Sequence, residues 1–145
     1  MKVQHFSIQI QASRAQVWEK LLGSESYQQW TEPFCPGSHY KGSWEEGASI
    51  HFLDPEGSGM VSRIAVNRPL EFVSIQHLGF LDKGQLDVES PAAKSMVDAR
   101  ENYTLRDQDG CTLVLIDTHV TPEFEAYMAE AWPRSLQRLK EICEA

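Results

Sequence analysis

The feature that most constrains this chain is a long helical pattern at its end, residues 121–145, "TPEFEAYMAEAWPRSLQRLKEICEA". Apolar side chains recur there at helical spacing, so one face of the helix must be buried. Thr121 is placed to cap this helix, and Pro122 suits its first turn. Pro133 lies inside the pattern and predicts a kink or break, because proline lacks a backbone donor.

The residues before this helix are organised mainly as strands. About six strands are expected between residues 39 and 120, where apolar and polar side chains alternate and Gly-containing turns intervene. The last two of these strands are joined by "QDG" (108–110), a strong hairpin signal. A first strand near the N-terminus is followed by two short helices, the first over residues 14–22 with Ser13 as its cap. This order predicts an α+β fold in which a curved antiparallel sheet of six or seven strands wraps around the C-terminal helix. A sheet closed by one helix leaves a hollow between them, so an internal cavity is expected.

Several stretches carry a family resemblance. They are "ASRAQVWEKL" (12–21), "GSWEEGASIHF" (42–52), "HLGFLDKGQLDVES" (77–90), "ARENYTL" (99–105) and "AWPRSLQRLKEICE" (131–144). Together they resemble the family named for the activator of the heat-shock-protein-90 ATPase, in the START-like (SRPBCC) superfamily. The resemblance covers nearly the whole chain and implies a helix-grip fold, with residues 1–145 as a single domain. That superfamily shares no catalytic motif, so the resemblance implies a cavity but no particular chemistry.

The residues between two of the strands, 82–97, form an unusually long polar excursion. It resembles an insertion that bacterial members of the family carry beside the cavity mouth. Residues 90–99, "SPAAKSMVDA", are expected to form a short helix, with Ser90 as its cap and Pro91 at its first position. Two interpretations stay open: an ordered surface connection, or a lid that moves when a ligand enters.

Large apolar and aromatic side chains from separate elements are the candidates for lining the cavity. A core role for these rings is the alternative. His77 alternates with Val73 and Ile75, so it is expected to point inward, where it would be a candidate base near neutral pH, with Tyr127 or Glu71 as a polar neighbour. The ligand-binding candidates are Trp30, Phe52, Phe72, His77, Tyr103, Phe124, Tyr127, Met128 and Trp132.

Three functions remain open at this point. The favoured one is binding of a hydrophobic or aromatic small molecule in the cavity, because it requires no motif. The second is a cyclase-, dehydratase- or hydrolase-type enzyme using the same cavity, which is less favoured because the sequence contains no catalytic motif. The third is a co-chaperone-like interaction domain. The eukaryotic co-chaperone has a separate N-terminal domain that contacts the chaperone, and 145 residues leave no room for it, so chaperone contact is not favoured.

Charge and cysteine content limit the classes of partner and the cellular compartment that are expected. The net charge is −8 and the 13 Lys and Arg residues form no run, so neither nucleic acid nor an anionic membrane is expected to bind. No signal peptide is visible, and the three cysteines are widely spaced, which favours a reduced, cytoplasmic protein. The histidines lack metal-ligand spacing, so neither a metal nor another cofactor is expected. Antiparallel edge strands leave a homodimer open.

Overall fold

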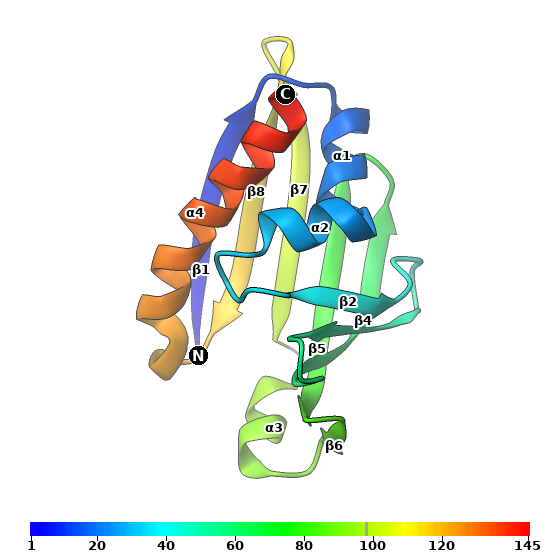
Figure 1. Cartoon of the computed structure of the whole chain (residues 1–145), viewed down its shortest axis with the longest axis vertical. Helices are drawn as coiled ribbons and strands as arrows, with labels where there is room; N and C mark the ends of the chain where they lie inside the picture. The colour runs from blue at the N-terminus through cyan, green and yellow to red at the C-terminus, as the bar shows by residue number, and fades with distance from the viewer. Residues whose placement is uncertain (98) are drawn as a thin grey trace.

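The computed structural model describes residues 1–97 and 99–145 and shows a curved antiparallel sheet with helices packed against one face (Figure 1). The first half of the chain contains β1 (Lys2–Ile10), α1 (Arg14–Leu22), α2 (Ser24–Trp30), β2 (His39–Gly42), β3 (Ser49–Leu53) and β4 (Gly59–Arg68). The second half contains β5 (Phe72–Asp82), β6 (Gln85–Asp87), α3 (Pro91–Met96), β7 (Arg100–Gln108), β8 (Cys111–Val120), the 3₁₀ turn η1 (Pro122–Phe124) and α4 (Glu125–Glu144). The predicted α+β helix-grip fold is confirmed.

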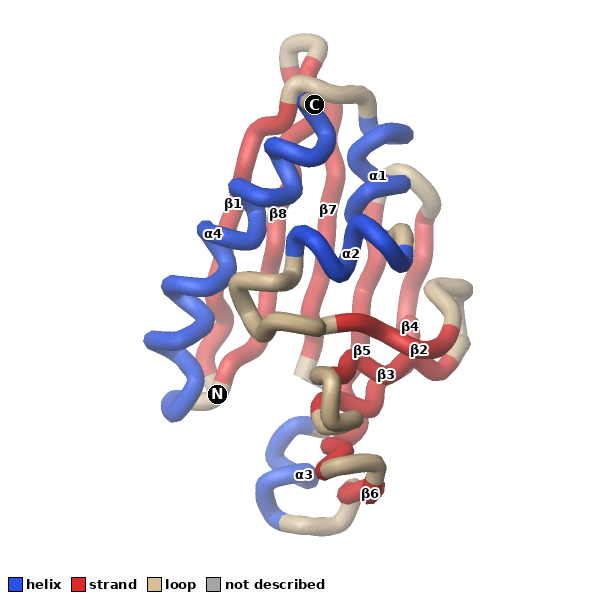
Figure 2. The backbone as a smooth tube through the Cα atoms, viewed as in Figure 1, coloured by secondary structure: helices blue, strands red, loops and turns tan. Residues whose placement is uncertain are grey.

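The strands pair in the order β1-β8-β7-β5-β4-β3-β2, and the short β6 pairs with β5. The sheet is open, because β1 and β2 form its two edges. Figure 2 shows how strongly it curls: β1, β8 and β7 lie at the back of the view, behind the layer of α4 and α2, whereas β2 crosses in front of the other strands at a steep angle. This curl creates the concave face that α1, α2 and α4 cover. β6 is the strand that the sequence pattern did not predict.

The local signals at the first helix and the last hairpin act as the sequence indicates. Ser13 Oγ accepts the backbone N–H of Gln16 at 3.2 Å, and the Gln16 side chain accepts the N–H of Ser13 at 3.3 Å, which together form a capping box. Asp109 and Gly110, with φ of 51° and 82°, form the left-handed turn that suits the twist between β7 and β8. α2, by contrast, begins after Gly23 without a side-chain cap.

The sequence predicted a kink or a break at Pro133. The C-terminal helix is continuous through this residue from Glu125 to Glu144, so it has no break there. Pro133 lies on the exposed side of α4, so water can reach the carbonyl that has lost its partner. On the opposite side, Trp132, Leu136 and Leu139 are buried. Packing of that face against the sheet outweighs the local cost of proline, since most helix stability in proteins comes from tertiary burial. Among the described residues, no helix is both long and apolar enough to cross a membrane.

Burial along β8 alternates strictly, as expected for a strand with one buried face. Val114 and Ile116 are fully buried in the main hydrophobic core, with partners such as Ile75 on the sheet and Leu136 on α4. Thr118, further along the same strand, borders a cavity instead. The concave face is therefore packed solid at one end and hollow at the other.

The polar excursion is ordered as β6 and α3 rather than as an irregular loop. The predicted helix is confirmed over Pro91–Met96: Ser90 Oγ accepts the N–H of Ala93 at 3.1 Å, and Pro91 occupies the first turn. Asp98, which lies within the predicted helical stretch, is outside the described residues. α3 packs against β5, and this contact places it beside the hollow end of the sheet.

Gly79 of β5 allows the polar excursion (residues 82–97) to pack closely against the strand. A Cβ added there would lie 2.5 Å from the carbonyl oxygen of Asp87 and 2.7 Å from Val88 Cγ1. We expect Gly79→Ala to push the insertion outward and to raise its cleavage rate by thermolysin about tenfold, while the core stays folded. Limited proteolysis with mass-spectrometric mapping tests this. The control is Glu89→Ala, an exposed change in the same segment; equal cleavage of both variants would contradict the role of Gly79.

Candidate functional site

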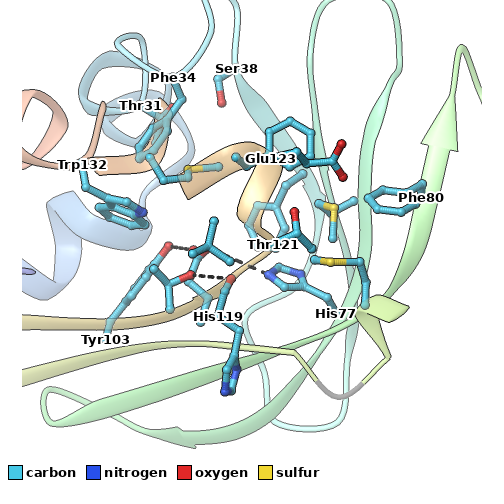
Figure 3. A pocket seen from close by; sticks show the side chains of 18 of the residues that line it. Thr31, Phe34, Ser38, His77, Phe80, Tyr103, His119, Thr121, Glu123 and Trp132 are labelled. Atoms are coloured by element: carbon cyan, nitrogen blue, oxygen red, sulfur yellow. Dashed lines mark hydrogen bonds and ion pairs between the residues drawn. The ribbon is translucent and has the colours of Figure 1, made fainter. Parts of the chain in front are cut away.

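A cavity of about 370 Å³ lies between the concave face of the sheet and the helices α2 and α4, with α3 contributing to its wall (Figure 3). The wall is mostly apolar, with Trp30 and Phe34 on one side and Phe80 and Met60 from the strands on another. Among the described residues that line it there is neither a lysine nor an arginine. The volume is at the lower end of the range for small-molecule sites.

The structure brings most of the sequence candidates together at this cavity, namely Trp30, Phe52, His77, Tyr103, Phe124, Met128 and Trp132. Phe72 does not line it. Side chains alternate along β5, so with Val73 and His77 on the concave face, Phe72 is on the other, where Arg68 lies 5.8 Å from its ring. Tyr127 does not line it either: its side chain turns outward and is 47% exposed, whereas the adjacent Met128 faces the cavity.

Three large rings form a connected wall. Trp30 lies 6.4 Å from Tyr103 and 6.1 Å from Trp132, and Tyr103 and Trp132 are 6.1 Å apart, measured between ring centroids. Phe34 packs edge-on against Trp132 at 4.9 Å. The Trp30 ring is held in place because its Nε1–H donates to the carbonyl oxygen of Leu21 at 3.1 Å. This wall offers a rigid surface to an apolar or aromatic molecule.

A small polar cluster of residues from β4, β5 and β7 reaches the cavity wall through His77, Glu101 and Tyr103. Ser62 Oγ lies 2.8 Å from His77 Nδ1, on two residues that face each other across β4 and β5. On the other side of the ring, His77 Nε2 is 3.9 Å from Glu101 Oε1. The hydroxyl of Tyr103 donates to Glu101 Oε2. The carboxyl group of Glu101 thus lies between a phenol and an imidazole at the cavity wall, and Figure 3 shows His77 and Tyr103 on either side of this space.

Burial sets the protonation of this cluster. It raises the pKa of Glu101 from 4.5 to about 7, although the hydrogen bond from Tyr103 acts in the opposite direction. It lowers the pKa of His77 from 6.5 to about 4, with a smaller contribution from His119. The pKa of Tyr103 is raised by burial and then by the nearby Glu101. Near neutral pH, His77 is therefore uncharged, and Glu101 is divided between its acid and carboxylate forms, able to donate or accept a proton.

Glu101 is a site residue that the sequence interpretation missed. It had paired His77 with Tyr127 or Glu71, but Tyr127 faces outward and Glu71 is exposed, 3.9 Å from Arg14 Nη1. The signal was present in "ENYTL", since Glu101 is two residues from the inward-facing Tyr103 and shares its face of the strand.

Thr121 contributes a second polar group that the sequence assigned differently. It precedes η1, but its side chain makes no capping hydrogen bond. Instead Thr121 is part of the cavity lining (Figure 3), and its Oγ1 is buried without a hydrogen-bond partner among the described residues. A buried hydroxyl normally finds a partner, so this atom is available to a molecule in the cavity.

The curved sheet, the long C-terminal helix and the cavity between them define a START-like, SRPBCC-type helix-grip domain. More specifically, the chain belongs to the family of activator of Hsp90 ATPase homolog 1-like proteins, whose profile matches residues 11–144. A comparison with curated proteins finds no match.

Solved structures similar to this chain share its fold at low sequence identity. DynU16, from the dynemicin biosynthetic locus, has a TM-score of 0.74 and 16% identity; the match covers 100% of this chain and 48% of DynU16, so the chain spans about half of that protein. The Aha1 dimer from Colwellia psychrerythraea has a TM-score of 0.73 and 21% identity, covering 99% of this chain and 97% of that one. CalU16 from Micromonospora echinospora has a TM-score of 0.68 and 14% identity, covering 97% and 75%.

Proposed function

We propose that this protein binds a small apolar or aromatic molecule in the cavity between the sheet and α4. The observation that carries the proposal is the composition of the cavity: a largely apolar wall around about 370 Å³, with one compact polar cluster at Glu101 and His77. Ligand sites in proteins typically combine apolar walls with a few placed polar groups, which fix orientation and give specificity. A solidly packed hydrophobic core would leave no such volume, and the buried Thr121 hydroxyl at the cavity wall has no hydrogen-bond partner among the described residues.

The arrangement suggests how the ligand lies. Its apolar body packs against Trp30, Trp132 and Met128, where the rings and the flexible thioether offer dispersion contacts. A polar group on the ligand reaches Glu101 or Thr121, whose side chains have spare hydrogen-bonding capacity. One ring system with one polar substituent matches this division of the wall.

We expect naphthylmethanol, a neutral aromatic probe, to bind the protein with a Kd below about 1 mM. The variant Met128→Trp should weaken binding at least about tenfold, because the larger ring fills cavity space. Isothermal titration calorimetry measures both values. The matched control is Tyr127→Trp, which places the same ring on the same helix but on its exposed side, and it should bind like the unmodified protein.

Native mass spectrometry of gently purified protein gives a second, independent readout. A co-purifying apolar compound, lost in Met128→Trp but kept in Tyr127→Trp, would support the proposal. If a broad panel of apolar and aromatic compounds leaves both heat and melting temperature unchanged, or if the two variants bind equally, the cavity is not the ligand site and the proposed function is wrong.

A further inference from the structure

We propose that the cavity selects cationic ligands, in which an apolar or aromatic body carries a protonated amine that pairs with the Glu101 carboxylate. This inference rests on the proposed small-molecule binding and names the ligand class. Its starting observation is a carboxyl group in the cavity wall with no basic side chain beside it among the described lining residues. Glu101 lines the cavity with its side chain only 21% exposed, and no lysine or arginine lies among the described lining residues.

The nearest basic side chain in sequence does not supply that charge. Arg100 precedes Glu101 on β7, so its side chain leaves the opposite face of the strand, where its guanidinium donates to Ser74 Oγ at 3.3 Å. Among the described residues, the Glu101 side chain interacts with the hydroxyl of Tyr103 and, at 3.9 Å, with the ring of His77. A buried carboxylate that has a hydrogen bond but no counter-charge is costly. A ligand ammonium would supply both the charge and further hydrogen-bond donors.

The titratable groups around Glu101 do not compete with such a cation. His77 from β5 is uncharged near neutral pH, because burial and His119 from β8 lower its pKa to about 4. Tyr103 from β7 and Tyr27 from α2 both have a raised pKa and stay neutral. Burial likewise raises the pKa of Glu101 to about 7, as expected for a carboxyl group whose counter-ion is absent.

The rest of the cavity also suits a cation with an aromatic body. Trp30, Tyr103 and Trp132 form the connected aromatic wall next to the carboxylate, and aromatic rings attract ammonium groups through their π faces. Glu123 on η1 adds a second carboxylate to the lining. The net charge of −8 attracts cations over a longer range and repels anions.

The test compares three naphthalene probes that differ only in their polar group: naphthylmethylamine, naphthylmethanol and naphthylacetate. Calorimetry at about pH 8, where Glu101 is mostly ionised, should give the order amine, alcohol, carboxylate, with the amine about tenfold tighter than the alcohol. At about pH 6, where Glu101 is mostly protonated, the preference for the amine should shrink, while alcohol binding stays constant.

The variant Glu101→Gln should abolish the preference, leaving amine and alcohol within about twofold of each other. The amide keeps the shape of the side chain and can still accept the Tyr103 hydroxyl, so the fold is expected to survive. Glu123→Gln is the matched control, because it also removes one carboxylate from the lining; it should keep most of the preference. If that control loses it as well, a general negative field rather than Glu101 selects the ligand, and the inference is wrong.

The outcomes separate this inference from the proposed function. Equal binding of amine and alcohol to the unmodified protein, or a preference that persists in Glu101→Gln or does not change with pH, overturns the cation inference but leaves small-molecule binding intact. Failure of all three probes and of the broader panel overturns both. Should Glu101→Gln not fold, the pH series on the unmodified protein still decides, because it titrates the same carboxyl group.

Discussion

Trp30→Ala is expected to lower the free energy of unfolding by about 3–5 kcal/mol, the typical range for removing a large buried ring. Trp30 is 0% exposed and contacts Tyr27 at 5.4 Å as well as the other two rings of the aromatic wall. Alanine would also leave the carbonyl oxygen of Leu21 without its Nε1–H donor. The ring separates the solid core from the cavity, so its loss should join a new void to the existing one. Urea unfolding followed by circular dichroism measures the change.

Two further variants make this expectation specific. Trp30→Phe keeps most of the apolar ring but loses the hydrogen bond, so it should cost less, about 1–2 kcal/mol. Trp18→Ala removes the same ring type from α1, where the side chain is only half-buried, and should also cost less than Trp30→Ala. If Trp18→Ala proves as damaging as Trp30→Ala, then Trp30 is not the main support of the cavity wall.

The order and position of the larger elements could be predicted because each carries its own local signal. Ser13 and the apolar spacing after it define α1, and Asp109-Gly110 defines the hairpin between β7 and β8. The misses occurred where tertiary contacts override local preference. β6 has only three residues, too few for a periodic pattern, and α4 passes through Pro133 because its buried face holds the helix together.

The cavity was predicted from the same order of elements. The side of the sheet to which an individual side chain points could not always be predicted from the sequence. Alternation correctly grouped His77 with Val73 and Ile75, yet it could not show which face is concave, and Phe72 was placed on the wrong one. The register of β5 shifts between Val61 and Ser62 on its partner strand, which leaves Leu78 as an extra residue. This bulge brings Phe80 into the cavity wall together with His77, and no sequence periodicity indicates it.

The polar cluster predicts opposite pH dependence of stability for two substitutions. The pKa of Glu101 is raised to about 7 in the folded protein, so its contribution is fully present below about pH 4.5 and is lost as the pH rises to about 7. The pKa of His77 is lowered to about 4, so its contribution is present above about pH 6.5 and is lost as the pH falls to about 4. In the unmodified protein these two trends largely cancel between pH 4.5 and 6.5.

Removing one of the two residues reveals its own pH trend as the difference in stability from the unmodified protein. Relative to the unmodified protein, Glu101→Gln should gain up to about 3 kcal/mol of stability as the pH rises from about 4.5 to about 7. His77→Gln should lose a similar amount relative to the unmodified protein as the pH rises from about 4 to about 6.5. The side chains of His77 and Glu101 are 9% and 21% exposed, so solvent screens these contributions only weakly.

Chemical denaturation at a series of pH values, with each variant compared to the unmodified protein, measures both slopes. The result also determines the charge state of the pair. If His77 and Glu101 instead formed an ion pair across their 3.9 Å separation, the pKa of Glu101 would be lowered and that of His77 raised, and both difference curves would change sign. Slopes of the expected sign would establish that His77 is uncharged over the pH range in which Glu101 ionises, so that an ammonium ligand meets a carboxylate that His77 does not neutralise.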